Sequence, residues 1–219
     1  MKNDNEKDSN FTSSTSFKGI YKRHQLKIFA ALSGILPFIF YLLTLERKLI
    51  GGDTSWYALK IPKMEVFVPT GYPTFSMLSK LFTYLPINDM AYRLNLFSAV
   101  FGALTILFLF LAAYRLTRNE PVSLLSSLCF AFVFPFWNIA NRLEFDTLNS
   151  FFVVLVIFSA VLYQQKLKRS YLYFFFFALG LTLTNHPIAF FIAPAFLIFV
   201  IIARPDIFKS IKAVFGSII

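Results

Sequence analysis

Carboxylate and guanidinium side chains border the long apolar segments of this 219-residue sequence. Asp53 stands shortly after the first apolar segment. A carboxylate there can take a proton from a hydroxyl group, or it can cap the helix that follows. Arg93 stands at the start of the second segment, where a guanidinium can bind phosphate bidentately or anchor the helix among lipid headgroups. The residue types alone leave both alternatives open at each position.

Two short polar turns interrupt the later apolar segments. The first contains Arg142, Glu144 and Asp146, and charges so close to a membrane boundary are often simply solvated. The second contains Asn185 and His186. An imidazole there can exchange a proton or donate to phosphate, whereas a structural role would be to satisfy the ends of broken helices. Polar groups at membrane depth usually face a cavity or a partner, which favours function for this pair.

The composition indicates an integral membrane protein. Hydrophobic residues make up 57% of the chain and charged residues 15%, and the mean hydropathy is +0.64. Soluble domains carry about 25% charged residues. The apolar residues also lie in long blocks, which excludes a soluble enzyme or a nucleic-acid-binding protein. The net charge of +10 comes from Lys and Arg beside these blocks, so we expect membrane lipids and no nucleic acid as partners.

The sequence contains little that would bind a metal or form a covalent cross-link. A single cysteine, Cys129, excludes a disulfide within the chain, and His24 and His186 are too far apart to form a metal-ligand motif. We therefore predict no metal site from the residues.

The apolar blocks predict an all-α membrane protein with about six transmembrane helices. Pro187 interrupts the last and longest block, because proline breaks a helix and disfavours helix in the residue before it. The predicted spans cover residues 28–45, 94–114, 122–140, 147–163, 171–184 and 188–203.

Charges around the spans predict the orientation. Residues 1–27 read as a disordered, basic, cytoplasmic tail, and residues 28–219 as one transmembrane domain that is truncated at its C-terminus. Residues 46–93 then form a long loop on the outer face. Among the short turns, the predicted outer ones hold a single basic residue, Arg142, as the positive-inside rule requires. The predicted cytoplasmic segments hold Arg115, Arg118, Lys166, Lys168, Arg169, Arg204, Lys209 and Lys212.

The outer loop contains two predicted interfacial helices. Over 73–85, Phe75, Leu78, Phe82 and Leu85 recur on one face, which is typical of an amphipathic helix lying at the membrane surface. Residues 54–60 predict a second short helix with Asp53 as its N-cap.

Five motifs in order resemble one family of multipass proteins, long described as a domain of unknown function. Its pattern runs roughly G-D-S-G-E, H-P-P-G-Y-P, Y-R-V-N-L-x-S-A, E-V-Y-x-L-N and N-H-H. The matching segments here are Gly52-Asp53-Thr54, Pro69-Thr70-Gly71-Tyr72-Pro73, Tyr92-Arg93-Leu94-Asn95-Leu96-Phe97-Ser98-Ala99, Glu144-Phe145-Asp146-Thr147-Leu148-Asn149 and Asn185-His186-Pro187.

The resemblance implies an enzymatic function, because eukaryotic relatives of that family are protein O-mannosyltransferases and the family is similar to the GT-C class of glycosyltransferases. It implies a polyprenyl-phosphate-linked sugar donor and a protein or glycan acceptor on the outer face, with a divalent metal left open. Asp53 would be the catalytic or acceptor-orienting carboxylate. Substrate would contact a set of residues carried over from the motifs: Tyr72, Arg93, Glu144, Asn185 and His186.

Several positions depart from the family pattern. The second acidic residue of the first motif falls on Trp56 or Tyr57, the histidine of the second on Val68, and the last histidine on Pro187. A non-catalytic membrane subunit or scaffold that keeps the fold is therefore the alternative function. A transporter or lipid-handling protein ranks third, because no internal repeat is clear and no acidic residue lies within a predicted span.

Overall fold

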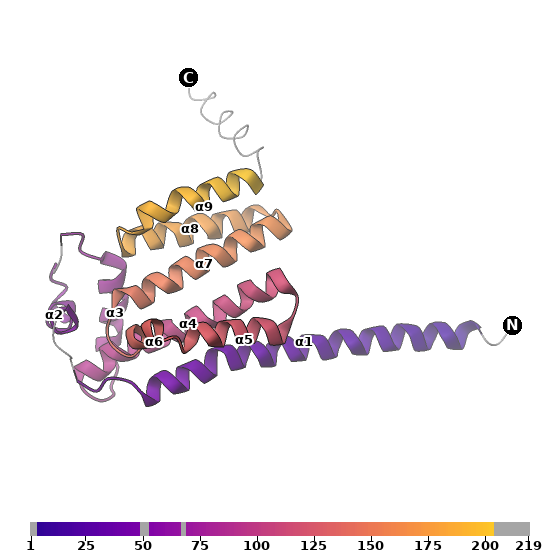
Figure 1. The fold of residues 1–219 in the computed structure, drawn as a ribbon, viewed down its shortest axis with the longest axis horizontal. Helices are drawn as coiled ribbons and strands as arrows, with labels where there is room; N and C mark the ends of the chain where they lie inside the picture. Colours follow the sequence, from indigo (N-terminus) through magenta and orange to yellow (C-terminus); the bar gives the residue numbers. More distant parts are fainter. Residues whose placement is uncertain (1–3, 49–52, 67–68, 204–219) are drawn as a thin grey trace, which may run out of the picture.

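The chain folds as a bundle of helices with two further helices across one end (Figure 1). The computed structural model describes residues 4–48, 53–66 and 69–203, and these contain no strand. The elements in chain order are α1 (Asp4–Leu43), α2 (Asp53–Lys60), the 3-10 helix η1 (Ile61–Lys63), α3 (Pro73–Thr83), α4 (Met90–Thr117), α5 (Glu120–Ala131), α6 (Phe134–Ala140), α7 (Phe145–Lys166), α8 (Arg169–Asn185) and α9 (Ala189–Ala203).

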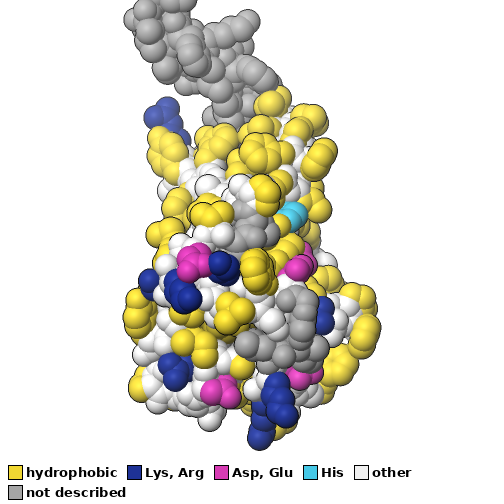
Figure 2. All heavy atoms as spheres, turned by 90° about the vertical axis from the view of Figure 1, so that its left-hand side faces the viewer, with side chains coloured by type: hydrophobic (Ala, Val, Ile, Leu, Met, Phe, Trp, Pro, Cys, Tyr) yellow, Lys and Arg dark blue, Asp and Glu magenta, His cyan; other side chains and the backbone are white. Residues whose placement is uncertain are grey.

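The long helices lie side by side in one layer that follows their connectivity. Helix α4 packs between α1 and α7, and α7 packs in turn against α8. Helices α2 and α3 lie at the end of the bundle where α1 ends and α7 begins. Viewed from that end, acidic, basic and hydrophobic side chains are intermixed (Figure 2).

The all-α membrane fold agrees with the sequence prediction, but the count of about six spans is not confirmed. Among the described residues, three helices are long and apolar enough to cross a membrane, or four if the bent pair α5 and α6 is one span. Helices α8 and α9 have 17 and 15 residues. At 1.5 Å per residue they reach only about 26 and 23 Å, short of a hydrocarbon core of about 30 Å.

Helix α1 differs from its prediction at the N-terminal end. The structure continues this helix from Asp4, through most of the residues that we predicted as a disordered tail. Its apolar part, His24–Leu43, is the candidate span. Extending an existing helix needs no new nucleus, which allows polar residues to continue the helix.

The predicted span over 122–140 is broken, because α5 and α6 meet at an angle of 70°. Pro135 cannot donate a hydrogen bond to the carbonyl of Ala131, and the backbone at Val133 is extended. The split in the last apolar block is confirmed, since α8 ends at Asn185 and α9 begins at Ala189.

The apolar face predicted for α3 turns inward and packs against the bundle. Phe75 is fully buried, and Leu78 and Phe82 pack against the same cluster. Full burial of such a side chain stabilises by about 1.5–3 kcal/mol. The cluster joins α2, α3, α4 and α7 through the buried side chains Tyr57, Ala58, Ile61, Phe75, Leu94, Phe97, Leu143, Leu148 and Phe152. It is the core on which the outer loop rests.

Candidate functional site

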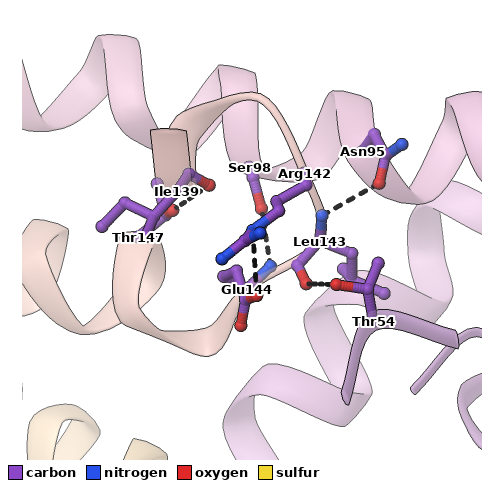
Figure 3. A network of polar contacts seen from close by, with 8 residues as sticks. All are labelled: Thr54, Asn95, Ser98, Ile139, Arg142, Leu143, Glu144 and Thr147. Carbon is purple, nitrogen blue, oxygen red and sulfur yellow. Dashed lines mark hydrogen bonds and ion pairs between the residues drawn. The ribbon is translucent and has the colours of Figure 1, made fainter. Parts of the chain in front are cut away.

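A buried asparagine on α4 holds the turn between α6 and α7 (Figure 3). The Asn95 side chain is inaccessible to solvent. Its Oδ1 accepts from the backbone N–H of Leu143 at 2.9 Å, and its Nδ2 donates to the carbonyl of Glu46 at 2.7 Å. Asn95 thus fixes the turn to the segment that follows α1.

Three hydroxyl groups complete this network around the turn. Ser98 accepts from the backbone N–H of Glu144 at 3.2 Å, and Thr54 of α2 donates to the carbonyl of Leu143 at 3.5 Å. Thr147 donates to the carbonyl of Ile139 at 2.9 Å. Because polar partners come from α2, α4 and α7, the backbone on both sides of Glu144 is held in one position (Figure 3).

Three carboxylates gather at this turn. Glu144, with 13% of its side chain exposed, forms an ion pair with Arg142, whose Nε lies 3.2 Å from Oε1. Burial raises the pKa of Glu144, the Arg142 charge lowers it, and the charges of Asp146 and Asp53 raise it further. Asp53 opens α2 and is exposed. The residues directly before it lie outside the described part of the chain, so its N-cap role stays a prediction.

Tyr57 lies beside the same carboxylates. Burial and the negative charges of Asp53 and Glu144 hold the pKa of its phenol well above the usual value. The phenol therefore stays protonated at every physiological pH. Its ring contacts Phe145 edge-on at a centroid distance of 6.4 Å.

His186 reaches this cluster from the junction of α8 and α9. Its ring stacks on Phe145 at a centroid distance of 4.6 Å and an interplanar angle of 5°, and it lies 5.2 Å from the ring of Tyr72. The backbone N–H of Ile188 donates to Nδ1 at 3.1 Å, so the neutral ring carries its proton on Nε2. The Asp146 carboxylate is close enough for its charge to interact with this imidazole.

Tyr72 and Asn185 are fixed around the same point. Tyr72 has a positive φ of 41°, and the adjacent Gly71 has 69°. The fully buried Asn185 donates through Nδ2 to the carbonyl of Phe145 at 3.5 Å. Thr74 and Thr184 share a hydrogen bond of 2.7 Å, which joins α3 to α8. Three segments far apart in the sequence therefore converge, as the sequence hypothesis requires.

Arg93 contacts a different part of the structure. All three nitrogens of its guanidinium donate to backbone carbonyls at the end of α3 and in the loop after it, those of Thr83, Ile87 and Asn88. These contacts differ from both roles expected from the sequence, phosphate binding and a headgroup anchor, because they fix the loop before α4.

Sequence reasoning gave little weight to Asp146 and overlooked Asn95, Ser98 and Tyr57 as parts of the site. A signal for Asn95 and Ser98 exists, because polar residues three apart in an apolar segment share one helix face and require partners. Nothing in the sequence indicates that Tyr57 lies beside the carboxylates. In the part of the chain that the structure describes, no group of three or more His, Cys, Asp or Glu residues is arranged to hold a metal ion.

The chain is similar to named proteins over most of its length. Residues 53–207 match the family described as the protein O-mannosyl-transferase TMEM260 N-terminal domain. The mouse (Mus musculus) protein O-mannosyl-transferase TMEM260 is 31% identical over 144 residues, which cover 65% of this chain and 20% of that protein. The Dictyostelium discoideum protein of the same name is 28% identical over 130 residues, 58% of this chain and 16% of the relative. The match thus spans about a fifth or less of these relatives, and no solved structure matches significantly.

Proposed function

Since the chain belongs to the family of the protein O-mannosyl-transferase TMEM260 N-terminal domain, we propose that it takes part in glycosyl transfer at the outer face of a membrane. The donor is a sugar linked to a polyprenyl phosphate, and the acceptor is a hydroxyl group of a protein or glycan. The observation that carries the proposal is the convergence of Asp53, Glu144, Asp146 and His186 from three separate segments at one end of the bundle.

The residues divide the reaction between them. Asp53 takes the proton from the acceptor hydroxyl while the acceptor oxygen forms its bond to the anomeric carbon. The bond between that carbon and the phosphate oxygen breaks, and its electron pair leaves with the phosphate. His186 donates its Nε2 hydrogen to a phosphate oxygen and stabilises the charge that develops there.

The remaining groups position the reactants. Glu144, held by Arg142 and the backbone bond to Ser98, accepts from a substrate hydroxyl. Tyr72 and Asn185 line the side of the site next to α8 and contact the substrate there. A site at the membrane surface, as proposed, suits this reaction, because a lipid-bound donor meets a water-soluble acceptor only at that depth.

Replacing the Asp53 carboxylate tests the proposal. In membranes that contain the full chain, we expect Asp53→Asn to lower sugar transfer from a radiolabelled polyprenyl-phosphate donor by about 10²–10⁴-fold, the usual contribution of a general base. Glu65→Gln is the matched control, since Glu65 is an outer-loop carboxylate paired with Lys60 and absent from the cluster. It should retain transfer.

The same assay distinguishes the proposed transferase from the alternative, a non-catalytic membrane subunit. If Asp53→Asn retained sugar transfer, Asp53 would not be the general base. A correctly inserted wild-type chain without transfer would favour a non-catalytic subunit, which the residues at Trp56 and Pro187 suggest because they depart from the family motifs.

A further inference from the structure

A small cavity of about 250 Å³ opens beside the site, between the turn before α3 and the junction of α8 with α9. Pockets for drug-sized ligands measure about 300–1,000 Å³, so this one suits a single ring. Its described lining residues are Thr70, Tyr72, Pro73, Leu183, Thr184, Asn185, His186, Pro187 and Phe190. They include no Lys or Arg, so the described lining offers a phosphate group no permanent positive charge.

Aromatic rings form part of the cavity wall. Tyr72 and His186 lie 5.2 Å apart between ring centroids, and Phe190 of α9 contributes a ring that is 66% exposed. Flat aromatic surfaces offer an apolar face to which the C–H groups of a sugar ring can bind. The hydroxyl groups of Thr70 and Thr184 add hydrogen-bonding capacity to the wall.

The buried amide of Asn185 points to a ligand that carries hydroxyl groups. Its Nδ2 donates to Phe145, but its Oδ1 has no hydrogen-bond donor among the described residues. A buried acceptor without a donor costs free energy, which a ligand O–H would recover. A neutral sugar supplies such a donor.

The backbone that presents Tyr72 is strained. An aromatic residue rarely adopts a positive φ, and here Tyr72 does so directly after Gly71 and before Pro73. Such conformations persist where the surrounding structure holds them, and they concentrate at ligand sites. The strain sets the Tyr72 ring against His186 at the cavity wall.

Resting on the transfer reaction proposed above, we propose that this cavity is a hexose subsite, which holds the neutral pyranose ring of the lipid-linked donor while the phosphate stays outside it. Tyr72 and Phe190 contact the ring faces, and the Asn185 amide oxygen accepts from a ring hydroxyl. The subsite therefore recognises the sugar and not the lipid phosphate.

A binding experiment with three probes tests this subsite. The full chain in lipid nanodiscs is titrated with a short-chain polyprenyl phosphate that carries a hexose, with the same phosphate without sugar, and with a methyl hexoside. We expect Asn185→Ala to weaken binding of the first probe about tenfold, the loss of one hydrogen bond, without weakening that of the second. Phe190→Ala at the exposed rim should do the same, and it tests the subsite even if Asn185→Ala does not fold.

Asn149→Ala is the matched control. Asn149 also has a buried amide oxygen without a donor among the described residues, but it is not part of the cavity lining. Its substitution should leave binding of all three probes unchanged.

Three outcomes would overturn the subsite. The cavity variants could weaken binding of the sugar-bearing and sugar-free probes equally, or weaken binding of neither. A methyl hexoside could also bind through Asn185 without competing with the lipid-linked probe. The last would place the sugar of an acceptor there. Binding needs no turnover, so a chain that binds as expected but transfers nothing would refute the proposed function alone.

Discussion

Two opposing influences act on the carboxyl group of Glu144. Partial burial disfavours its charged form, and the nearby Asp53 and Asp146 charges act in the same direction. Arg142 acts against them through an ion pair at 3.2 Å. Since the pKa is raised on balance, burial outweighs the ion pair, and the folded chain binds a proton at Glu144 more tightly than the unfolded chain.

This balance predicts how stability depends on pH. A carboxyl group whose pKa is higher in the folded state contributes stability that is fully present below the ordinary Glu value of 4.5 and is lost as the pH rises through the folded value. We expect Glu144→Gln to melt at a higher temperature than the wild type at pH 7, with the difference vanishing below pH 4.5. Melting curves of the purified chain across this range measure it, and a difference that grows on acidification would contradict it.

Arg142→Gln should shift the pH dependence of stability in the opposite direction to Glu144→Gln. It removes the charge that lowers the pKa of Glu144, so the pKa rises further and the loss of stability extends to higher pH. Glu65→Gln serves as the control with the opposite sign. Glu65 has a lowered pKa because Lys60 hydrogen-bonds to it. The stability that Glu65 contributes is therefore present above its ordinary pKa of 4.5 and is lost as the pH falls.

At the residue scale, the candidate residues named from the sequence can be compared with their positions in the structure, and their roles stay predictions. Five of them lie near one another, because each stands in a turn or at a helix terminus at the same end of the bundle: Asp53, Tyr72, Glu144, Asn185 and His186. Arg93 lies at that end too, but its side chain turns to the carbonyls of the loop after α3. Side-chain direction depends on where free carbonyls lie, and the sequence does not show that.

At the scale of elements, α4 determines the geometry of the site. It places Asn95 and Ser98 one turn apart on the face toward the 141–144 turn, where they bind the backbone at Leu143 and Glu144. The carboxylate of Glu144 thus depends on a helix that contributes no charge to the cluster. Asn95 is a positioning residue.

Removing the Asn95 amide should cost both stability and transfer. Asn95→Ala leaves the buried N–H of Leu143 without an acceptor, so we expect a loss of about 1–3 kcal/mol in unfolding free energy. A displaced turn should lower kcat by up to about a hundredfold, the effect of an ångström-scale misplacement. Equilibrium unfolding in mixed detergent and initial rates of sugar transfer measure the two effects.

Thr105→Val on the same helix is the control for Asn95. Thr105 is also fully buried, but its hydroxyl donates only to the carbonyl of Phe101 one turn earlier. That carbonyl keeps its helical hydrogen bond, so the loss should stay below about 1 kcal/mol. An equal loss from both variants would show that Asn95 has no special role in holding the turn.

The sequence predicted where the helices occur better than it predicted where they bend and which way their faces point. Each long helix contains an apolar block that predicted it, and Pro187 correctly predicted the division of the last block into α8 and α9. The same reasoning treated 122–140 as one span, although Pro135 bends it by 70°. Proline is tolerated inside α1 at Pro37, so its presence alone does not decide whether a helix bends. Nor does the amphipathic pattern over α3 show that Phe75 packs inward against Phe97 of α4.

At the scale of the whole molecule, both ends of the bundle carry charges, and the end away from the site is rich in basic residues. The carboxylates of the site lie where α7 begins, and Arg115, Arg118, Lys166 and Arg169 lie at or beside the other ends of α4, α7 and α8. Helix α7 has 22 residues, which at 1.5 Å each span about 33 Å, enough to cross the hydrocarbon core. By the positive-inside rule, we propose that the basic end lies on the cytoplasmic side.

Cysteine labelling tests this orientation in cells. In a Cys129→Ser background, Leu59→Cys and Gln164→Cys place exposed thiols on α2 and at the far end of α7. We expect a membrane-impermeant maleimide to label the first in intact cells, and the second only after permeabilisation. Labelling of Gln164→Cys alone in intact cells would invert the molecule and place the acidic site in the cytoplasm. Labelling of both would show that α7 does not cross the membrane, because its two ends cannot otherwise be reached from one side.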